Sequence, residues 1–303
     1  MEKVINSFKN LYKGEEIAAK HWSLISLFIL PAILSGAASL MDKDTPPQVM
    51  IIIGIAVLAL FALSIVPFIW LLGYSIRFAE DRMMDRTGIP KIDLNMLWEG
   101  VKVLPLTIVW GIYFAIVFIV IMALPFLPLI GSNGDTSSII IAILGFFVAL
   151  MVVLAFCVLV VPFYNYIIIE YIKYGLQGYL FNPLTLVNFM KAAFKDTVIV
   201  FAKFWAVAIV ASIPMGILNV FIFIIAFGAL AISAAGASSD SDAAIYNPLT
   251  ISIVMILGTL MAILQMYVNT MIANAATENY VEVYKTEIEV LENKEEFDIK
   301  QDI

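Results

Sequence analysis

Residues 105–130 read PLTIVWGIYFAIVFIVIMALPFLPLI and contain no charged side chain. A helix needs roughly 20 apolar residues to cross the hydrocarbon core of a bilayer. The whole chain has the same character, because 62% of its 303 residues are hydrophobic and only 14% are charged. Soluble domains are about half apolar and a quarter charged. The stretch therefore predicts a transmembrane helix, and its apolar excess must face lipid.

Five further apolar runs occur along the chain, at residues 22–41, 47–76, 138–169, 198–232 and 249–272. No charge interrupts the central part of any run, although Lys203 falls near the start of one. Several runs are long enough that their helices must tilt, bend or emerge into water. Kinks are expected at Pro67, Pro162 and Pro214, because proline removes a backbone hydrogen bond and crowds the preceding turn.

The basic residues lie on one side of these six runs. Sixteen of the 17 Lys and Arg residues flank that side, and only Lys43 lies in the short, acidic loops 42–46, 131–137 and 233–246. Loops rich in Lys and Arg stay in the cytoplasm. We therefore expect a multi-pass protein of the cell membrane with both termini in the cytoplasm.

Three short amphipathic segments, residues 4–12, 94–104 and 186–194, lead into spans and are expected to lie flat at the membrane surface. Asp93 opens the second and is an expected N-cap, and Thr185 opens the third. The tripeptide Val-Pro-Phe that begins at Val66 occurs again at Val161, 95 residues later.

These patterns predict an all-α membrane protein with six transmembrane helices and three short interfacial amphipathic helices, built as a degenerate threefold repeat. The repeat units are residues 1–90, 91–180 and 181–281, which together form a single integral membrane domain. Residues 282–303 are expected to be an acidic cytoplasmic tail.

Residues 72–101 read LGYSIRFAEDRMMDRTGIPKIDLNMLWEGV. A Gly-Tyr at a span end, a charged helical exit, a Gly-x-Pro turn and an amphipathic helix with Gly resemble the membrane family called domain of unknown function 4013. The resemblance covers mainly residues 60–130, with a fainter echo at 160–215. There Gly175 to Gly178 replace the charged exit, and Asn182-Pro183 replaces the Gly-x-Pro turn. The resemblance implies a polytopic fold, no established activity and no functional residue.

Polar side chains within membrane spans are costly and mark candidate sites. Side chains four apart share a helix face, which pairs Gln265 with Asn269 and Asn274 with Glu278. A hydrophilic cavity opening to the cytoplasm is one interpretation, and hydrogen bonds that fix helix packing are the alternative. The candidate cavity residues are Asn165, Glu170, Gln265, Asn269, Asn274 and Glu278.

The leading functional hypothesis is a non-enzymatic membrane protein for transport, export or lipid handling. The alternatives are a scaffold or accessory subunit whose tail docks a cytoplasmic protein, and an intramembrane enzyme on lipid or prenyl substrates. The enzyme would hold Mg²⁺ with Asp81 and Asp85, yet Arg77 is placed to pair with Glu80 and Asp81, and Arg82 with Asp85.

No catalytic residue, cofactor or metal is predicted. With one His, His21, and one Cys, Cys157, a His/Cys metal site is excluded. His21 is expected to be a boundary anchor, and Cys157 is expected to pack within its helix. The bilayer is the expected partner, and nucleic acid is not, because the chain has no basic stripe.

Overall fold

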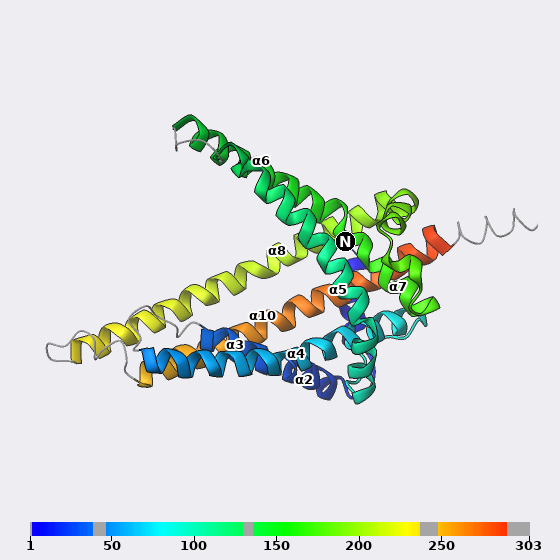
Figure 1. Cartoon of the computed structure of the whole chain (residues 1–303). Helices are drawn as coiled ribbons and strands as arrows, with labels where there is room; N and C mark the ends of the chain where they lie inside the picture. The colour runs from blue at the N-terminus through cyan, green and yellow to red at the C-terminus, as the bar shows by residue number, and fades with distance from the viewer. Residues whose placement is uncertain (1, 39–46, 130–135, 237–247, 290–303) are drawn as a thin grey trace, which may run out of the picture. The chain divides into compact units, whose positions relative to one another are not determined.

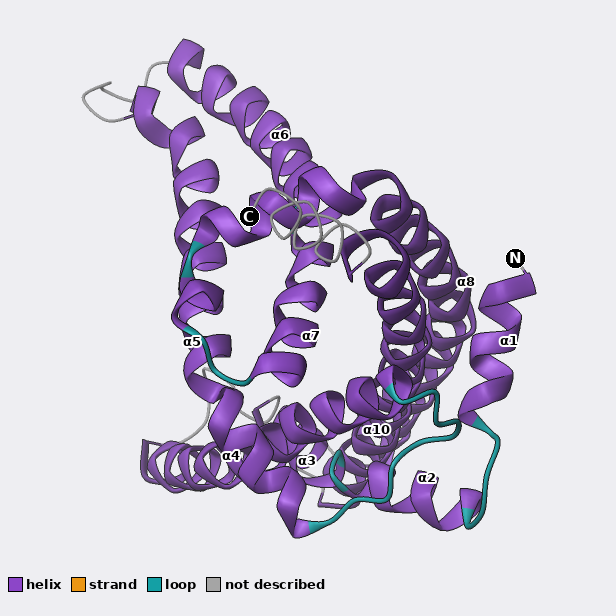
Figure 2. Cartoon of the chain, turned by 90° about the vertical axis from the view of Figure 1, so that its right-hand side faces the viewer, coloured by secondary structure: helices purple, strands orange, loops and turns teal. Residues whose placement is uncertain are grey.

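The computed structural model describes residues 2–38, 47–129, 136–236 and 248–289, and within them the chain is helical without a strand (Figures 1 and 2). The elements in order are α1 (Glu2–Leu11), α2 (Ile17–Ser26), α3 (Ile29–Ala38), α4 (Pro47–Met83), α5 (Leu94–Ala123), η1 (Leu124–Leu129), α6 (Thr136–Leu159), η2 (Val161–Phe163), α7 (Tyr164–Tyr174), η3 (Gly178–Phe181), α8 (Pro183–Gly236), α10 (Pro248–Val283) and η4 (Tyr284–Ile288). η4 is a short π-helix, and the other η elements are 3₁₀ helices.

Five helical segments in the described part of the chain are long and apolar enough to cross a membrane. They are Phe61–Met83, Leu94–Leu129, Thr136–Tyr174, Pro183–Phe221 and Ile256–Ile288. On α5, Ile116, Phe118 and Ile119 are about half exposed or more, as side chains facing lipid would be. The chain is an integral membrane protein of all-α class.

The first expected span, residues 22–41, is not one long helix. The structure has a shorter apolar segment, Ile17–Ile33, and residues 39–46 lie outside its described part. The helix breaks between α2 and α3, where Leu27 and Phe28 donate to carbonyls only three residues back, at 3.2 and 3.0 Å. Pro31 explains the break, because it has no N–H for the Leu27 carbonyl and its ring crowds that group.

Of the three prolines at which kinks were expected, one interrupts its helix and two lie within continuous helices. α6 ends at Leu159, and the 3₁₀ turn η2 contains Pro162, so the helix is interrupted there as predicted. α4 and α8 are each assigned as one helix through Pro67 and Pro214. The backbone of α8 instead leaves helical geometry at Ala193, with φ −130° and ψ 27°.

The chain forms two compact units. The first unit comprises Met1–Asp81, Asp85–Gly100 and Phe204–Ala275, and the second comprises Arg82–Met84, Val101–Lys203 and Ala276–Ile303. In the first unit α3 and α4 lie beside α10 (Figure 1). Tyr74 and Phe78, near the end of α4, are buried. In the second unit α5 and α6 form a pair joined through η1, and Phe163, Tyr166 and Ile167 are fully buried.

Two glycines allow α4 and the start of α5 to touch backbone to backbone in the first unit. A Cβ added at Gly73 would lie 1.6 Å from the Met96 carbonyl oxygen, and one added at Gly100 would lie 1.9 Å from the Ile69 carbonyl oxygen. No side chain fits at either contact. These are the glycines of the Gly-Tyr and amphipathic-helix parts of the 72–101 stretch.

The loop between α4 and α5 is fixed by its own sequence. Gly88 has φ +85° and donates its N–H to the Asn10 carbonyl at 2.8 Å, which seats the loop on the end of α1. Asp93 accepts the Met96 N–H at 3.1 Å, so the predicted N-cap of α5 is confirmed.

The three amphipathic segments differ in whether they form a helix of their own or the start of a longer one. Residues 4–12 correspond to the separate helix α1, whereas 94–104 and 186–194 are continuous with α5 and α8. α8 begins at Pro183 and is capped by Asn182, whose side chain accepts the Leu184 N–H at 3.0 Å. The helix therefore begins before Thr185, the residue expected to open this segment, because proline at the first helical position sets the start earlier.

Candidate functional site

Glu170 is a buried carboxylate near the end of α7, with 2% of its surface exposed. Its Oε2 accepts a hydrogen bond from the Tyr179 hydroxyl at 2.7 Å, and its Oε1 accepts one from the Tyr284 hydroxyl. The two donors come from η3 and η4, so the carboxylate joins three elements of the second unit. Hydrogen bonds to an ionised oxygen are stronger than neutral ones and offset part of the cost of burial.

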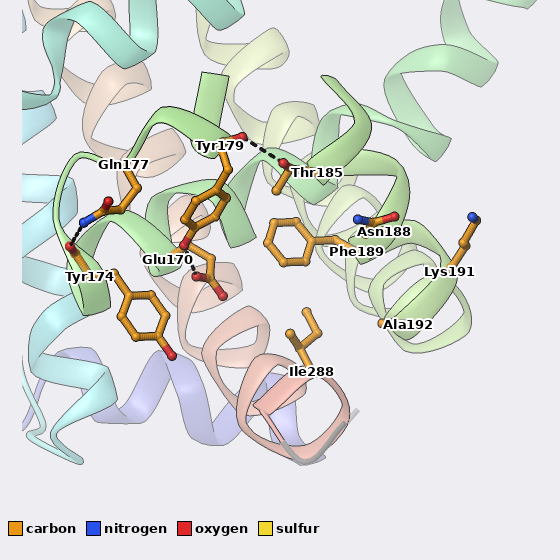
Figure 3. A pocket seen from close by; sticks show the side chains of 10 residues that line it. All are labelled: Glu170, Tyr174, Gln177, Tyr179, Thr185, Asn188, Phe189, Lys191, Ala192 and Ile288. Atoms are coloured by element: carbon orange, nitrogen blue, oxygen red, sulfur yellow. Dashed lines mark hydrogen bonds between the residues drawn. The ribbon is translucent and has the colours of Figure 1, made fainter. Parts of the chain in front are cut away.

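Glu170 lines a pocket of about 990 Å³ in the second unit. Figure 3 shows Glu170 and Tyr179 on one side and the first turns of α8, with Thr185 and Phe189, across from them. Ile288 of η4 closes a further side. Most of the side chains that line it carry a polar group. Its volume falls within the range of small-ligand sites.

The connection between α7 and α8 is built to hold Tyr179 over Glu170. Gly175 ends α7 with φ +74°, and its N–H donates to the Tyr171 carbonyl at 2.8 Å. Thr185, at the start of α8, donates its hydroxyl to the Tyr179 carbonyl at 2.8 Å. Hydrogen bonds at Gly175 and at Thr185 therefore fix both ends of the connection, and with it the pocket wall that carries Tyr179.

Two other predicted site residues of the second unit have partners within that unit. Asn165 donates to the Pro162 carbonyl at 2.8 Å and so satisfies a backbone group at the helix break. Glu278 forms an ion pair with the buried Arg82, with 3.2 Å between Oε2 and Nε. These two contacts are of the packing kind that the alternative interpretation anticipates.

Three predicted site residues belong to the first unit. Asn274 is buried and donates to the Tyr74 hydroxyl at 2.7 Å. Asn269 lines a separate, mainly apolar pocket, and Gln265 is exposed on the same helix. The six residues are divided between the two units, so a single cavity that they would share stays a prediction.

The charged exit of α4 contains the expected local pair. Arg77 donates to Glu80 at 2.8 Å, as the spacing predicts, and Asp81 pairs with Arg86 at 3.2 Å. Asp85 lies beyond the end of α4 with φ 57°. In the described part of the chain, no group of three or more His, Cys, Asp or Glu side chains could hold a metal ion.

Several side chains have roles that spacing alone did not reveal. Tyr179 and Tyr284 serve Glu170 from 9 and 114 residues away in sequence. His21 was expected to be an anchor, but it is buried, with Nδ1 2.7 Å from the Tyr267 hydroxyl and its ring stacked on Tyr12. Cys157 is exposed on α6 and not packed as expected.

The sequence matches the family described as protein of unknown function (DUF4013) over residues 57–220, more than half of the chain. The chain belongs to this family. The DUF4013 match includes Glu170, Tyr179 and the start of α8, whereas Tyr284 and Ile288 lie beyond it. No curated protein and no solved structure matches the chain. The family has no established activity, so the chain is an integral membrane protein of unknown function.

Proposed function

We propose that this DUF4013 protein binds a small organic cation in the Glu170 pocket and carries it across the membrane, as a non-enzymatic transporter or exporter. The observation that supports this proposal most is a buried carboxylate that lines an open pocket of about 990 Å³. Two tyrosine hydroxyls occupy one position on each carboxylate oxygen, and each oxygen has a further lone pair for a ligand.

The charges and rings of the pocket favour a cation. Glu170 supplies a negative group, and the rings of Tyr174 and Tyr179 supply faces that attract positive charge. The amine of Lys173 already lies 5.0 Å from the centre of the Tyr174 ring. Lys191 is the basic residue of the pocket wall, and Figure 3 shows its amine directed away from Glu170.

The proposal includes a topology of six crossings in three repeated units, with α2 and α3 making the first crossing. The distribution of Lys and Arg supports both termini in the cytoplasm. Gly175 to Asn182 then follow an inward crossing, and the pocket opens to the cytoplasm. Export from that side would load the cation at Glu170.

The test is ligand-dependent stabilisation of the purified full chain. The probes are ethylamine, putrescine and tetramethylammonium, with ethylene glycol and acetate as neutral and acidic comparisons. A ligand at 100 times its Kd stabilises the folded state by about 2.7 kcal/mol, which is readily seen as a higher Tm. We expect at least one cation to raise the Tm and the neutral and acidic probes to leave it unchanged.

Glu170→Gln keeps the shape of the side chain and removes its charge, so the rise in Tm should disappear. Glu282→Gln is the matched control, because Glu282 is an exposed glutamate of α10 outside the pocket wall. In vesicles, uptake of the radiolabelled cation should fall in the first variant and persist in the second. Equal responses of the two variants, or no response to any cation, would exclude the proposal.

A further inference from the structure

A second pocket lies in the first unit between α3, α4 and α10, which run side by side in Figure 1. It has a volume of about 560 Å³. Its walls are mainly aromatic and aliphatic and include Phe28, Phe61, Phe68 and Met266. Phe61 and Phe68 are 59% and 53% exposed on a helix that is long and apolar enough to span the bilayer. The pocket is therefore a groove on a surface that meets lipid.

The groove has one polar end. Asn274 donates to Tyr74, which fixes the register of α10 against α4. Leu71 and Thr270 both lie about one helical turn before that contact, so Asn269 and Thr270 are level with the Leu71 end. Phe61 lies ten residues earlier on α4, about 15 Å away along the helix axis.

The polar end of the groove is the end near the membrane surface. Beyond Tyr74, α4 continues into the charged exit with Arg77, Glu80 and Asp81, where the chain leaves the hydrocarbon. The Phe61 end points the other way, into the apolar part of the span. A groove that is apolar in depth and polar at the surface has the polarity of a membrane lipid.

Asn269 is the side chain that a ligand would use. The Thr270 hydroxyl is already engaged, because it donates to the Met266 carbonyl at 2.8 Å. Asn269 is exposed, and its amide has two donor hydrogens. An amide facing hydrocarbon costs free energy unless it finds an acceptor. In a bilayer, the oxygens that link the chains of a lipid to its glycerol lie at the boundary between hydrocarbon and headgroups, where this end of the groove would lie.

We propose that one membrane phospholipid binds this groove, with a hydrocarbon chain along Leu71, Phe68 and Phe61 and a glycerol-linked oxygen accepting from Asn269. The site is in the first unit and uses none of the residues of the Glu170 pocket. The proposal can therefore be tested independently of the proposed transport of a cation, and failure of one does not imply failure of the other.

The test is native mass spectrometry of the full chain, purified in detergent and titrated with phosphatidylglycerol. The lipid is added as a diester and, separately, as a diether with the same headgroup and chain length. Ser64 lies in the groove wall and Leu63 beside it does not, so Ser64→Trp fills the groove while Leu63→Trp is the control. We expect the first variant to lose one tightly bound lipid and the control to retain it. A lipid retained by Ser64→Trp, or lost equally from both variants, overturns the proposal.

Asn269→Leu is the second test of lipid binding and applies even if Ser64→Trp does not fold. Asn269 is exposed, so its replacement leaves the packing intact. The apparent Kd should rise about three- to tenfold, the effect of one hydrogen bond. Weakening of the diester alone identifies its carbonyl as the acceptor, and equal weakening of both lipids identifies the linking oxygen. Unchanged binding of both lipids overturns the proposal.

Discussion

Single side chains connect segments that are far apart in this sequence. Glu170 is held by Tyr179 and Tyr284, and Arg82 by Glu278. Residues three or four apart on one helix can be paired from the sequence, as Arg77 and Glu80 were. The partners Tyr284 and Glu278 could not, because they depend on how distant helices fold together. The sequence indicated only that Tyr284 and Glu278 are polar side chains near the end of a span, and it did not indicate their partners.

Gly73→Ala should destabilise the protein, because its Cβ would meet the Met96 carbonyl at 1.6 Å. The backbones of α4 and α5 must separate, and overpacking of this kind costs roughly 1–3 kcal/mol. Unfolding in detergent, followed by intrinsic fluorescence, should show a lower Tm than the native chain.

Gly111→Ala is the control for that measurement. Gly111 also lies on α5, and nothing is within 4 Å of the position of its Cβ. Alanine there should be neutral or slightly stabilising, by up to about 1 kcal/mol, because it favours the helix more than glycine does. If both variants melt alike, close contact at Gly73 does not hold α4 against α5.

At the scale of elements, helix ends were partly predictable. The cap at Asp93 followed from a short polar side chain just before an apolar periodic segment. The start of α8 was placed too late, at Thr185, although Asn182 followed by Pro183 was the stronger signal. The break between α2 and α3 was also missed, since a long apolar run conceals the effect of Pro31 on the preceding carbonyl.

Asp93→Ala should cost about 0.5–2 kcal/mol of stability, because the Met96 N–H loses its acceptor. The Asp93 carbonyl that accepts from the Trp70 indole at 2.8 Å is unaffected. Denaturant unfolding monitored by circular dichroism measures the loss. Asn95→Ala, at an exposed position two residues on, should change stability far less, and an equal loss in both variants would argue against a capping role.

At the scale of the whole molecule, composition was the most reliable guide. An apolar fraction of 62% and uncharged runs of about 25 residues identify a helical membrane protein, and five helices of sufficient length occur in the described part of the chain. The Glu170 pocket was only half anticipated. Glu170 stood out as a carboxylate at the end of a span, whereas its pocket arises from the α7–α8 connection and η4, which lie apart in sequence. Tyr284 and Ile288 are buried. The acidic tail expected over residues 282–303 stays a prediction.

The proposed loading of a cation at Glu170 depends most on the side of the membrane to which the pocket opens. Labelling intact cells and inside-out vesicles with a membrane-impermeant maleimide tests it, in a background where the one native cysteine is replaced by Cys157→Ser. Gln177→Cys places the probe on the pocket wall, and Asn133→Cys places it in an acidic loop one crossing earlier. We expect Gln177→Cys to react only in inside-out vesicles and Asn133→Cys only in intact cells. Reaction of both positions from the same side, or of Gln177→Cys from outside, would contradict this expectation.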